Sequence, residues 1–142
     1  MRRVTIATVL LLTGQGSAFA TASLGCEVAD KNVKLVAEGI VSRGMGEVFV
    51  SLNGEVEVLA KGAPSDLRKV QFTGQHLTQR WAYGKALKLR IYRDEPSGWL
   101  ELVIEAQAGK DGLSHRGRYV LTVQEGQRAP MTLRGRISCS LG

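Results

Sequence analysis

The feature that most constrains this sequence is an alternation of apolar and polar side chains with a period of two residues. The runs 87–91, 100–106 and 119–123 each place an aliphatic or aromatic residue at every second position. Neighbouring side chains point to opposite faces in a β-strand, so each run predicts a strand with one apolar face. No long run follows the helical period. The alternation therefore predicts an all-β chain.

Turn-forming residues separate the alternating runs. The segments 62–66 and 94–98 are rich in Gly, Pro, Asp and Ser, and 125–130 contains Gly and Pro; these residues favour chain reversal. About eight short strands separated by such turns are typical of an antiparallel β-sandwich or a small flattened barrel. Residues 74–84 begin and end on Gly and fit neither period, so we interpret them as a long connection or an irregular strand.

The dipeptide Asn53-Gly54 predicts a hairpin, because this pair favours the left-handed backbone of tight turns. A three-residue loop over 52–54 would pair Val50 with Val56 and Val48 with Val58. A two-residue loop would instead mix apolar and charged residues on one face. The longer loop is therefore expected.

The start of the chain has the order of a secretory signal. Two arginines precede an apolar run over 4–12, and small-x-small motifs then end at Ala20 and Ala22. The apolar run is shorter than the ~20 residues that a transmembrane helix needs. We expect residues 1–22 to be a cleavable signal peptide and 23–142 to be a single all-β domain. The exported protein would then be periplasmic or secreted.

The two cysteines, Cys26 and Cys139, lie near opposite ends of this domain. A single pair of cysteines in an exported chain predicts one structural disulfide. An alternative starts from the segment 23–26, Ser-Leu-Gly-Cys, which loosely resembles a lipoprotein cleavage box. In that case Cys26 would carry a lipid anchor and Cys139 would stay unpaired.

Composition excludes several classes of protein. The full chain has 19 Lys+Arg and 13 Asp+Glu, for a net charge of +6, and removing the signal leaves 17 against 13, or +4. This excess is too small to indicate a nucleic-acid partner. No segment after the signal is apolar enough to predict a membrane span.

No catalytic or metal-binding pattern rises above background. The only histidines, His76 and His115, lack metal-ligand spacing from each other and from the cysteines. Glu101 and Glu105 share a strand face but would lie about 13 Å apart, farther than the carboxyl pair of a glycosidase. We expect no enzyme activity, no cofactor and no metal.

Charged residues occur in blocks of alternating sign along the chain. One interpretation is that neighbouring antiparallel strands of opposite charge form cross-strand ion pairs. The other is that Lys88, Arg90, Arg134 and Arg136 form one basic patch for an anionic partner. The second interpretation requires the two strands that carry these residues to be neighbours.

One segment has the composition of a recognition surface, because aromatic residues and arginine are enriched at binding interfaces. The candidate partner-binding residues are Trp81, Tyr83, Arg90, Tyr92 and Trp99. The leading hypothesis is a non-enzymatic module that binds another envelope protein or an anionic envelope polymer. The alternatives are a β-barrel carrier of a small apolar ligand and, least favoured, a hydrolase with a site near His76.

Overall fold

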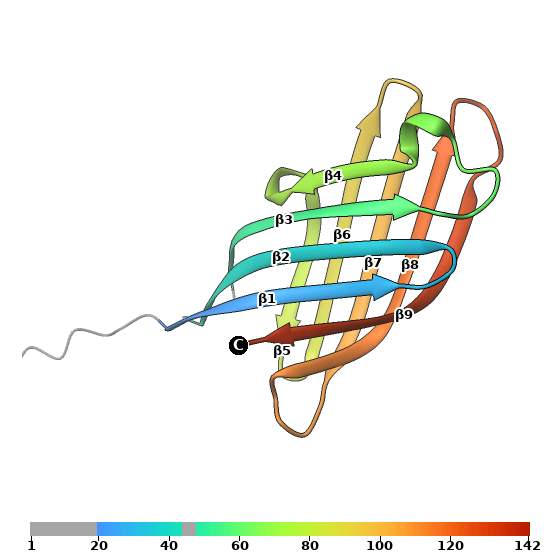
Figure 1. The fold of residues 1–142 in the computed structure, drawn as a ribbon. Helices are drawn as coiled ribbons and strands as arrows, with labels where there is room; N and C mark the ends of the chain where they lie inside the picture. The colour runs from blue at the N-terminus through green and yellow to red at the C-terminus, as the bar shows by residue number, and fades with distance from the viewer. Residues whose placement is uncertain (1–19, 44–47) are drawn as a thin grey trace, which may run out of the picture.

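The computed structural model describes residues 20–43 and 48–142, which are almost entirely antiparallel β-structure (Figure 1). The strands are β1 (Ala20–Ala29), β2 (Val33–Arg43), β3 (Val48–Val58), β4 (Lys69–Thr73), β5 (Leu77–Tyr83), β6 (Ala86–Glu95), β7 (Gly98–Ala108), β8 (Ser114–Glu125) and β9 (Met131–Leu141), and the short 3-10 helices η1 (Ser65–Leu67) and η2 (Gly74–His76) flank β4. Within the described ranges, these nine strands form one sheet in the order β4-β3-β2-β1-β9-β8-β7-β6-β5. The predicted all-β flattened barrel is confirmed, with nine strands rather than about eight.

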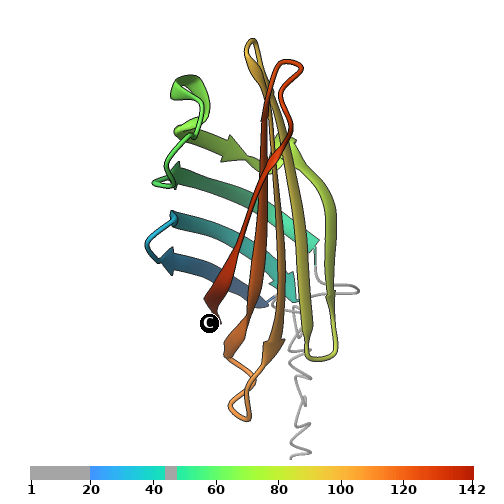
Figure 2. The ribbon, with the colours of Figure 1, turned by 90° about the vertical axis from the view of Figure 1, so that its right-hand side faces the viewer.

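The sheet folds over on itself into two layers (Figures 1 and 2). Strands β1–β4 form one layer and β5–β8 cross behind them at a steep angle, as in orthogonally packed sheets. The long strand β9 curves from the second layer into the first, pairing with β8 along most of its length and with β1 at its end. The two end strands of the sheet, β4 and β5, are joined in sequence by η2.

The core lies between the layers and is built from the inward side of the predicted alternation. Strand β7, for example, is buried at every second residue from Leu100 to Ala106. The largest fully buried side chains come from both layers and are Tyr119, Phe72, Leu24, Leu35, Leu52, Leu67, Leu89, Ile91, Leu100, Leu102, Ile104 and Leu121. The inner face of β5–β9 is thus covered, and its outer face stays open to solvent.

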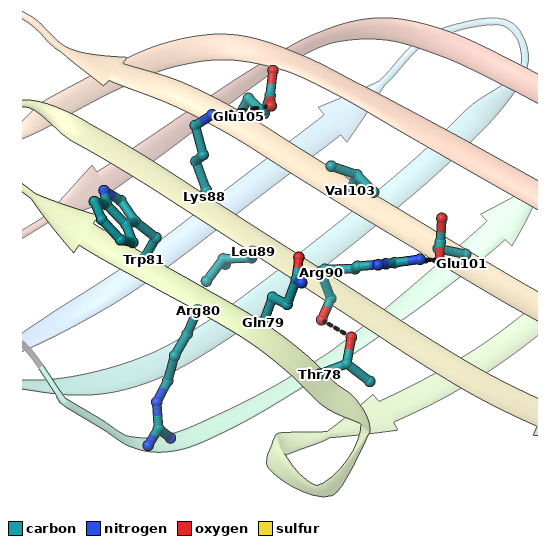
Figure 3. Close-up of a pocket in the computed structure, with 10 residues that line it drawn as sticks. All are labelled: Thr78, Gln79, Arg80, Trp81, Lys88, Leu89, Arg90, Glu101, Val103 and Glu105. Carbon is teal, nitrogen blue, oxygen red and sulfur yellow. Dashed lines mark hydrogen bonds and ion pairs between the residues drawn. The ribbon is translucent and has the colours of Figure 1, made fainter.

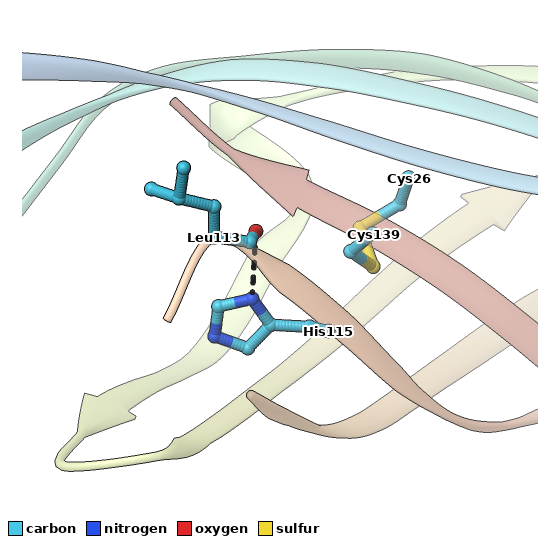
Figure 4. Close-up of a disulfide and its surroundings, with 4 residues drawn as sticks. All are labelled: Cys26, Leu113, His115 and Cys139. Carbon is cyan, nitrogen blue, oxygen red and sulfur yellow. Dashed lines mark hydrogen bonds between the residues drawn. A yellow bond between two sulfur atoms is a disulfide. The ribbon is translucent and has the colours of Figure 1, made fainter. Parts of the chain in front are cut away.

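The seam between β1 and β9 carries the disulfide (Figure 4). Cys26 and Cys139 are directly opposite each other in the register of these strands, and both are buried. The bond occupies the Cys26 sulfur that a lipid anchor would need, so a disulfide and lipidation exclude each other at this residue. A structural disulfide also indicates an oxidising compartment.

A buried tyrosine ties the second layer to the turn between β1 and β2. The Tyr119 hydroxyl donates a hydrogen bond of 2.6 Å to Asp30, whose other carboxylate oxygen accepts the backbone N–H groups of Asn32 and Val33 at 2.8 Å. Gly135 lies opposite Tyr119, and a Cβ at this position would collide with the tyrosine ring. The missing side chain therefore leaves room for the contact.

The Tyr119–Asp30 contact shifts the pKa values of both side chains. Burial, and then the hydrogen bond to Asp30, raises the pKa of Tyr119 well above its usual value. Partial burial works against ionisation of Asp30, but the hydrogen bonds from Tyr119 and the two amides outweigh it and lower the pKa of this carboxyl. The ionised Asp30 therefore stabilises the fold.

The predicted hairpin at Asn53-Gly54 is wrong. β3 runs unbroken through both residues and pairs with β2 on one side and β4 on the other. Gly54 is a glycine for a different reason: a Cβ there would collide with the Phe72 ring of β4. Pairing with two neighbouring strands has overridden the local turn preference.

The inward assignment of Val50 is also wrong. Ile40 pairs with Ser51 and Val41 pairs with Phe49, so Val50 is left without a partner on β2, as in a β-bulge. The bulge reverses the face of the residues before it. Phe49 is consequently buried, while Val50 is 64% exposed.

β5 and β1 lie in segments for which the sequence did not clearly predict a strand. The irregular segment 74–84 contains η2 and the edge strand β5, whose register shifts between Leu77 and Gln79. β1 begins at Ala20, so its first residues overlap the predicted signal peptide 1–22. Residues 1–19 of that peptide lie outside the described part of the chain, and the cleavage remains a prediction.

Replacing Tyr119 by Phe should lower the free energy of unfolding by about 1.5–3 kcal/mol near neutral pH, because it removes a hydrogen bond to a charged group. The lowered pKa of Asp30 means that its stabilising effect is present above the usual Asp pKa and is lost as the pH falls through the folded value. The gap between wild type and variant should therefore narrow below about pH 4. Urea unfolding from pH 7 to pH 2 measures it.

Tyr92→Phe is the matched control for this variant. It also removes a tyrosine hydrogen bond to a carboxylate, in this case Asp94 at 2.8 Å, but at the solvent-exposed surface. It should change stability little. Equal losses from the two substitutions, or a Tyr119→Phe loss that persists unchanged in acid, would contradict the proposed role of the buried pair.

Removing the disulfide should destabilise the domain strongly. The two cysteines are separated by 113 positions, and closing a loop of this length contributes about 4–5 kcal/mol in the chain-entropy treatment. The double variant Cys26→Ala/Cys139→Ala should therefore unfold at much lower urea than the oxidised protein. Reducing agent should destabilise the wild type but leave the double variant unaffected. A wild type indifferent to reducing agent would show that the bond does not form.

Candidate functional site

Two exposed aromatic side chains stand side by side on the edge strand β5. Trp81 is 58% exposed and Tyr83 is 78% exposed, and their rings make an edge-to-face contact with centroids 6.2 Å apart. Residues two apart on a strand share a face, which explains their proximity. Tyr and Trp are enriched at interfaces, so a contiguous exposed pair of these rings is a candidate binding surface.

The second predicted aromatic pair lies at the other end of the same face. Tyr92 on β6 and Trp99 on β7 have ring centroids 5.9 Å apart, and both are partly buried. Lys88, which faces Trp81 in register, is four residues from Tyr92 and so about 13 Å away along β6. The predicted aromatic surface is therefore two separate pairs.

An open groove of about 940 Å³ lies beside the first pair on the outer face of β5–β7 (Figure 3). Its lining residues are Thr78, Gln79, Arg80, Trp81, Lys88, Leu89, Arg90, Glu101, Val103 and Glu105. The volume is within the range of ligand-binding clefts, about 300–1,000 Å³. Of the five predicted partner-binding residues, the groove brings together Trp81 and Arg90.

Ion pairs hold four of the five charged side chains that line this groove, and Arg80 takes part in none of the ion pairs found in the described chain. Arg90 donates two hydrogen bonds to Glu101, the closer at 2.5 Å, and Lys88 contacts Glu105 at 3.3 Å. Arg118 on β8 reaches the same Glu105 at 2.6 Å. Hydrogen bonds from Arg118 and then Lys88 lower the pKa of Glu105. The groove therefore presents fixed donors and acceptors with little net charge.

The groove continues across the remaining strands of the layer. A second depression of about 350 Å³ is lined by Val103, Glu105, Arg118, Val120 and Arg134, and it shares the first two of these residues with the larger groove. β7, β8 and β9 are neighbours in the sheet. A shallow channel thus crosses the strands from the aromatic pair on β5 to the arginine on β9.

The two interpretations of the charge blocks can now be compared. Opposite charges do pair across neighbouring strands, on β6 and β7 and also between Lys69 and Glu55 at 3.0 Å. The predicted basic patch is wrong in its membership, because β7 and β8 separate β6 from β9. Lys88 and Arg90 are neutralised by β7 and do not join Arg134 or Arg136.

Neither histidine lies in the channel. The His76 Nδ1 accepts the backbone N–H of Thr73 at 3.0 Å and so caps the turn at η2. His115 is buried on β8, opposite Cys139, and its Nδ1–H faces the Leu113 carbonyl oxygen at 3.3 Å (Figure 4). The alternation of side chains along β8 turns His115 inward.

A small cavity accompanies His115 at one end of the barrel. It holds about 230 Å³ and includes Phe49, Leu113 and Leu141 in its lining. This is below the usual range for a ligand cleft. Ser114, next to His115, points to the outer face and donates to Asp111 at 2.6 Å, so these three residues do not form a catalytic triad.

Over 20–43 and 48–142, no group of three or more His, Cys, Asp or Glu side chains is arranged to hold a metal ion. In the same ranges no helix has the length and apolarity needed to cross a bilayer. Comparison of the chain with protein-family models, curated protein sequences and solved structures found no match.

Proposed function

We propose that this chain is a non-enzymatic, exported binding module that holds an extended envelope polymer along the outer face of β5–β9. The observation that carries the proposal is the channel that starts at the exposed pair Trp81 and Tyr83 and crosses the strands to β9. A groove that continues into a second depression suits a chain-like ligand better than a compact molecule.

The chemistry of the channel fits a polysaccharide. Exposed Trp and Tyr faces can stack on the apolar faces of sugar rings, and this contact is lost if the rings are removed. Arg90, Glu101 and Glu105 are held by ion pairs, so they can exchange hydrogen bonds with hydroxyl groups at little cost in side-chain ordering. Preorganised polar groups of this kind favour specificity.

The alternative to an envelope polymer is another protein bound on the same face. Protein interfaces usually have an apolar centre. Among the residues described on strands β5–β9, the exposed large apolar side chains are Trp81 and Tyr83. The rest of the channel combines Val103 and Val120 with charged side chains, and these charged groups favour a hydroxyl-rich polymer.

The carrier alternative and the hydrolase alternative have weaker support. The inward side chains are large and come from both layers, which favours a filled interior over a ligand cavity. His76 has its Nδ1 committed to a backbone N–H and lies away from the channel lining. Neither alternative has an observation of its own in its favour.

The location outside the cytoplasm can be tested by mass. A bacterial host expressing the full chain should release a protein that lacks residues 1–22, or 1–20 if the first small-x-small motif is used. Its intact mass should show the loss of two hydrogen atoms for the disulfide and no lipid. An uncleaved cytoplasmic product would contradict export. A mass raised by an acyl-glycerol group would identify Cys26 as a lipid anchor.

Polymer binding can be followed through Trp81. Because the chain has two tryptophans, Trp99→Phe leaves Trp81 as the sole emitter. Titration with polygalacturonate or dextran should shift its emission to the blue as the indole leaves water. Calorimetry should show Trp81→Ala/Tyr83→Ala binding at least roughly tenfold more weakly than wild type, the loss expected for central aromatic contacts.

Tyr92→Ala is the matched control, because it removes an aromatic ring from the same face but outside the channel. It should bind as tightly as wild type. Unchanged affinity in Trp81→Ala/Tyr83→Ala, or no response of the wild type to either polymer, would overturn the proposal.

A further inference from the structure

The outer faces of β8 and β9 carry a concentration of arginine, of which only Arg118 takes part in an ion pair found in the described chain, with Glu105 of β7. The β8–β9 arginine patch consists of Arg116, Arg118, Arg134 and Arg136, all exposed. Arg118 lies directly opposite Arg136 in the register, and Arg134 lies opposite Val120 one row along. The four side chains thus share one continuous surface beside the channel.

Acidic residues are nearly absent from this surface. The other outward positions described on β8 and β9 hold Ser, Thr, Val and Gln, until Glu125 at the end of β8, which pairs with Arg128 at 2.5 Å. Glu105 contacts Arg118 but also contacts Lys88. Glu27 of β1 lies opposite Ser138, and no ion pair found in the described chain joins it to the patch.

The arrangement runs against the pattern of the rest of the molecule. On β3 with β4, β6 with β7 and β7 with β8, the ion pairs found across strands join residues that are opposite each other in register or nearly so, and Arg118 itself is paired in this way with Glu105. Like charges directly opposite on a sheet are destabilising. Arg136 therefore lies opposite a like charge, and no ion pair found in the described chain joins it to a carboxylate; keeping it there costs stability, which points to a role in binding.

The residue type indicates the ligand chemistry. Arginine holds carboxylate and phosphate groups through two parallel hydrogen bonds and is weakly hydrated, whereas lysine acts as a point charge. All four cations of the patch are arginine. Arg118 and Arg134 also line the channel where it reaches β9.

We propose that the channel ligand is an acidic polysaccharide whose carboxylate groups are held by the β8–β9 arginine patch while a sugar ring stacks on Trp81. This inference rests on the proposed function, and it adds the charge of the ligand and the direction of its path across the strands. The ion-paired Glu101 and Glu105 in the middle of the face can accept sugar hydroxyls. They would repel a plane of anionic lipid headgroups, so a single polymer chain is favoured over a membrane.

The test compares three probes at low salt: polygalacturonate, which carries a carboxylate on each sugar, neutral dextran, and phosphatidylcholine vesicles containing one quarter phosphatidylglycerol. Wild type should bind polygalacturonate more tightly than dextran by roughly tenfold or more. Arg134→Gln/Arg136→Gln should remove most of this preference and weaken the dependence of affinity on salt.

Arg128→Gln is the matched control. It removes one arginine charge, against two in the test variant, from the turn between β8 and β9, where Arg128 is paired with Glu125. It should bind polygalacturonate within about twofold of wild type, as expected for a charge outside the contact surface. A second readout separates binding from folding: relief of the Arg118–Arg136 repulsion should leave the urea midpoint of Arg134→Gln/Arg136→Gln unchanged or raised while affinity falls.

The outcomes distinguish this inference from the proposed function. If Trp81→Ala weakens polymer binding and Arg134→Gln/Arg136→Gln does not, the polymer channel stands and the anionic ligand is overturned. If only the arginine variant weakens binding, the anion patch stands and the aromatic channel is overturned. Equal affinity for dextran and polygalacturonate, or binding to the vesicles in preference to polygalacturonate, overturns the acidic polysaccharide.

Discussion

The pairing of β1 with β9 is the contact on which the architecture depends. All other neighbours in the sheet are consecutive along the chain, so the two halves would otherwise be separate meanders. The β1–β9 ladder is short, running from Leu24–Leu141 to Glu27–Ser138. A short pairing between distant segments carries a large ordering cost. The disulfide within this ladder reduces that cost, and the Tyr119–Asp30 contact beside it helps to offset the remainder.

This closure also determines where the candidate site lies. Because β1–β4 fold over the inner face of β5–β9, the apolar side of the second layer is buried and its polar side faces solvent. Five adjacent strands then supply one broad outer surface. The aromatic pair is at the β5 edge and the arginines are next to the β1 seam. A channel across strands is the direct consequence of that order.

The sequence predicts the local pattern well and the pairing poorly. Alternation identified the inward faces of β6, β7 and β8, because a half-buried strand imposes a period of two. It did not identify β1, although Ala22, Leu24, Cys26 and Val28 alternate there. The prediction of a signal peptide drew the domain boundary through this strand. Asn53-Gly54 misled because its turn preference is local, whereas the Phe72 ring that fills the space at Gly54 comes from another strand.

Which charged side chains face each other depends on the strand order, and the sequence alone does not determine that order. The blocks of charge predict cross-strand pairing for any arrangement that places opposite blocks together, and β6 with β7 meets this condition. β8 and β9 are both drawn from one basic block, and their adjacency sets Arg118 against Arg136. Because a turn joins these two strands of like charge, their arginines repel each other. The packing of the sheet does not explain why the arginines are kept. The acidic polysaccharide proposed as the ligand, lying over both strands, would relieve that repulsion.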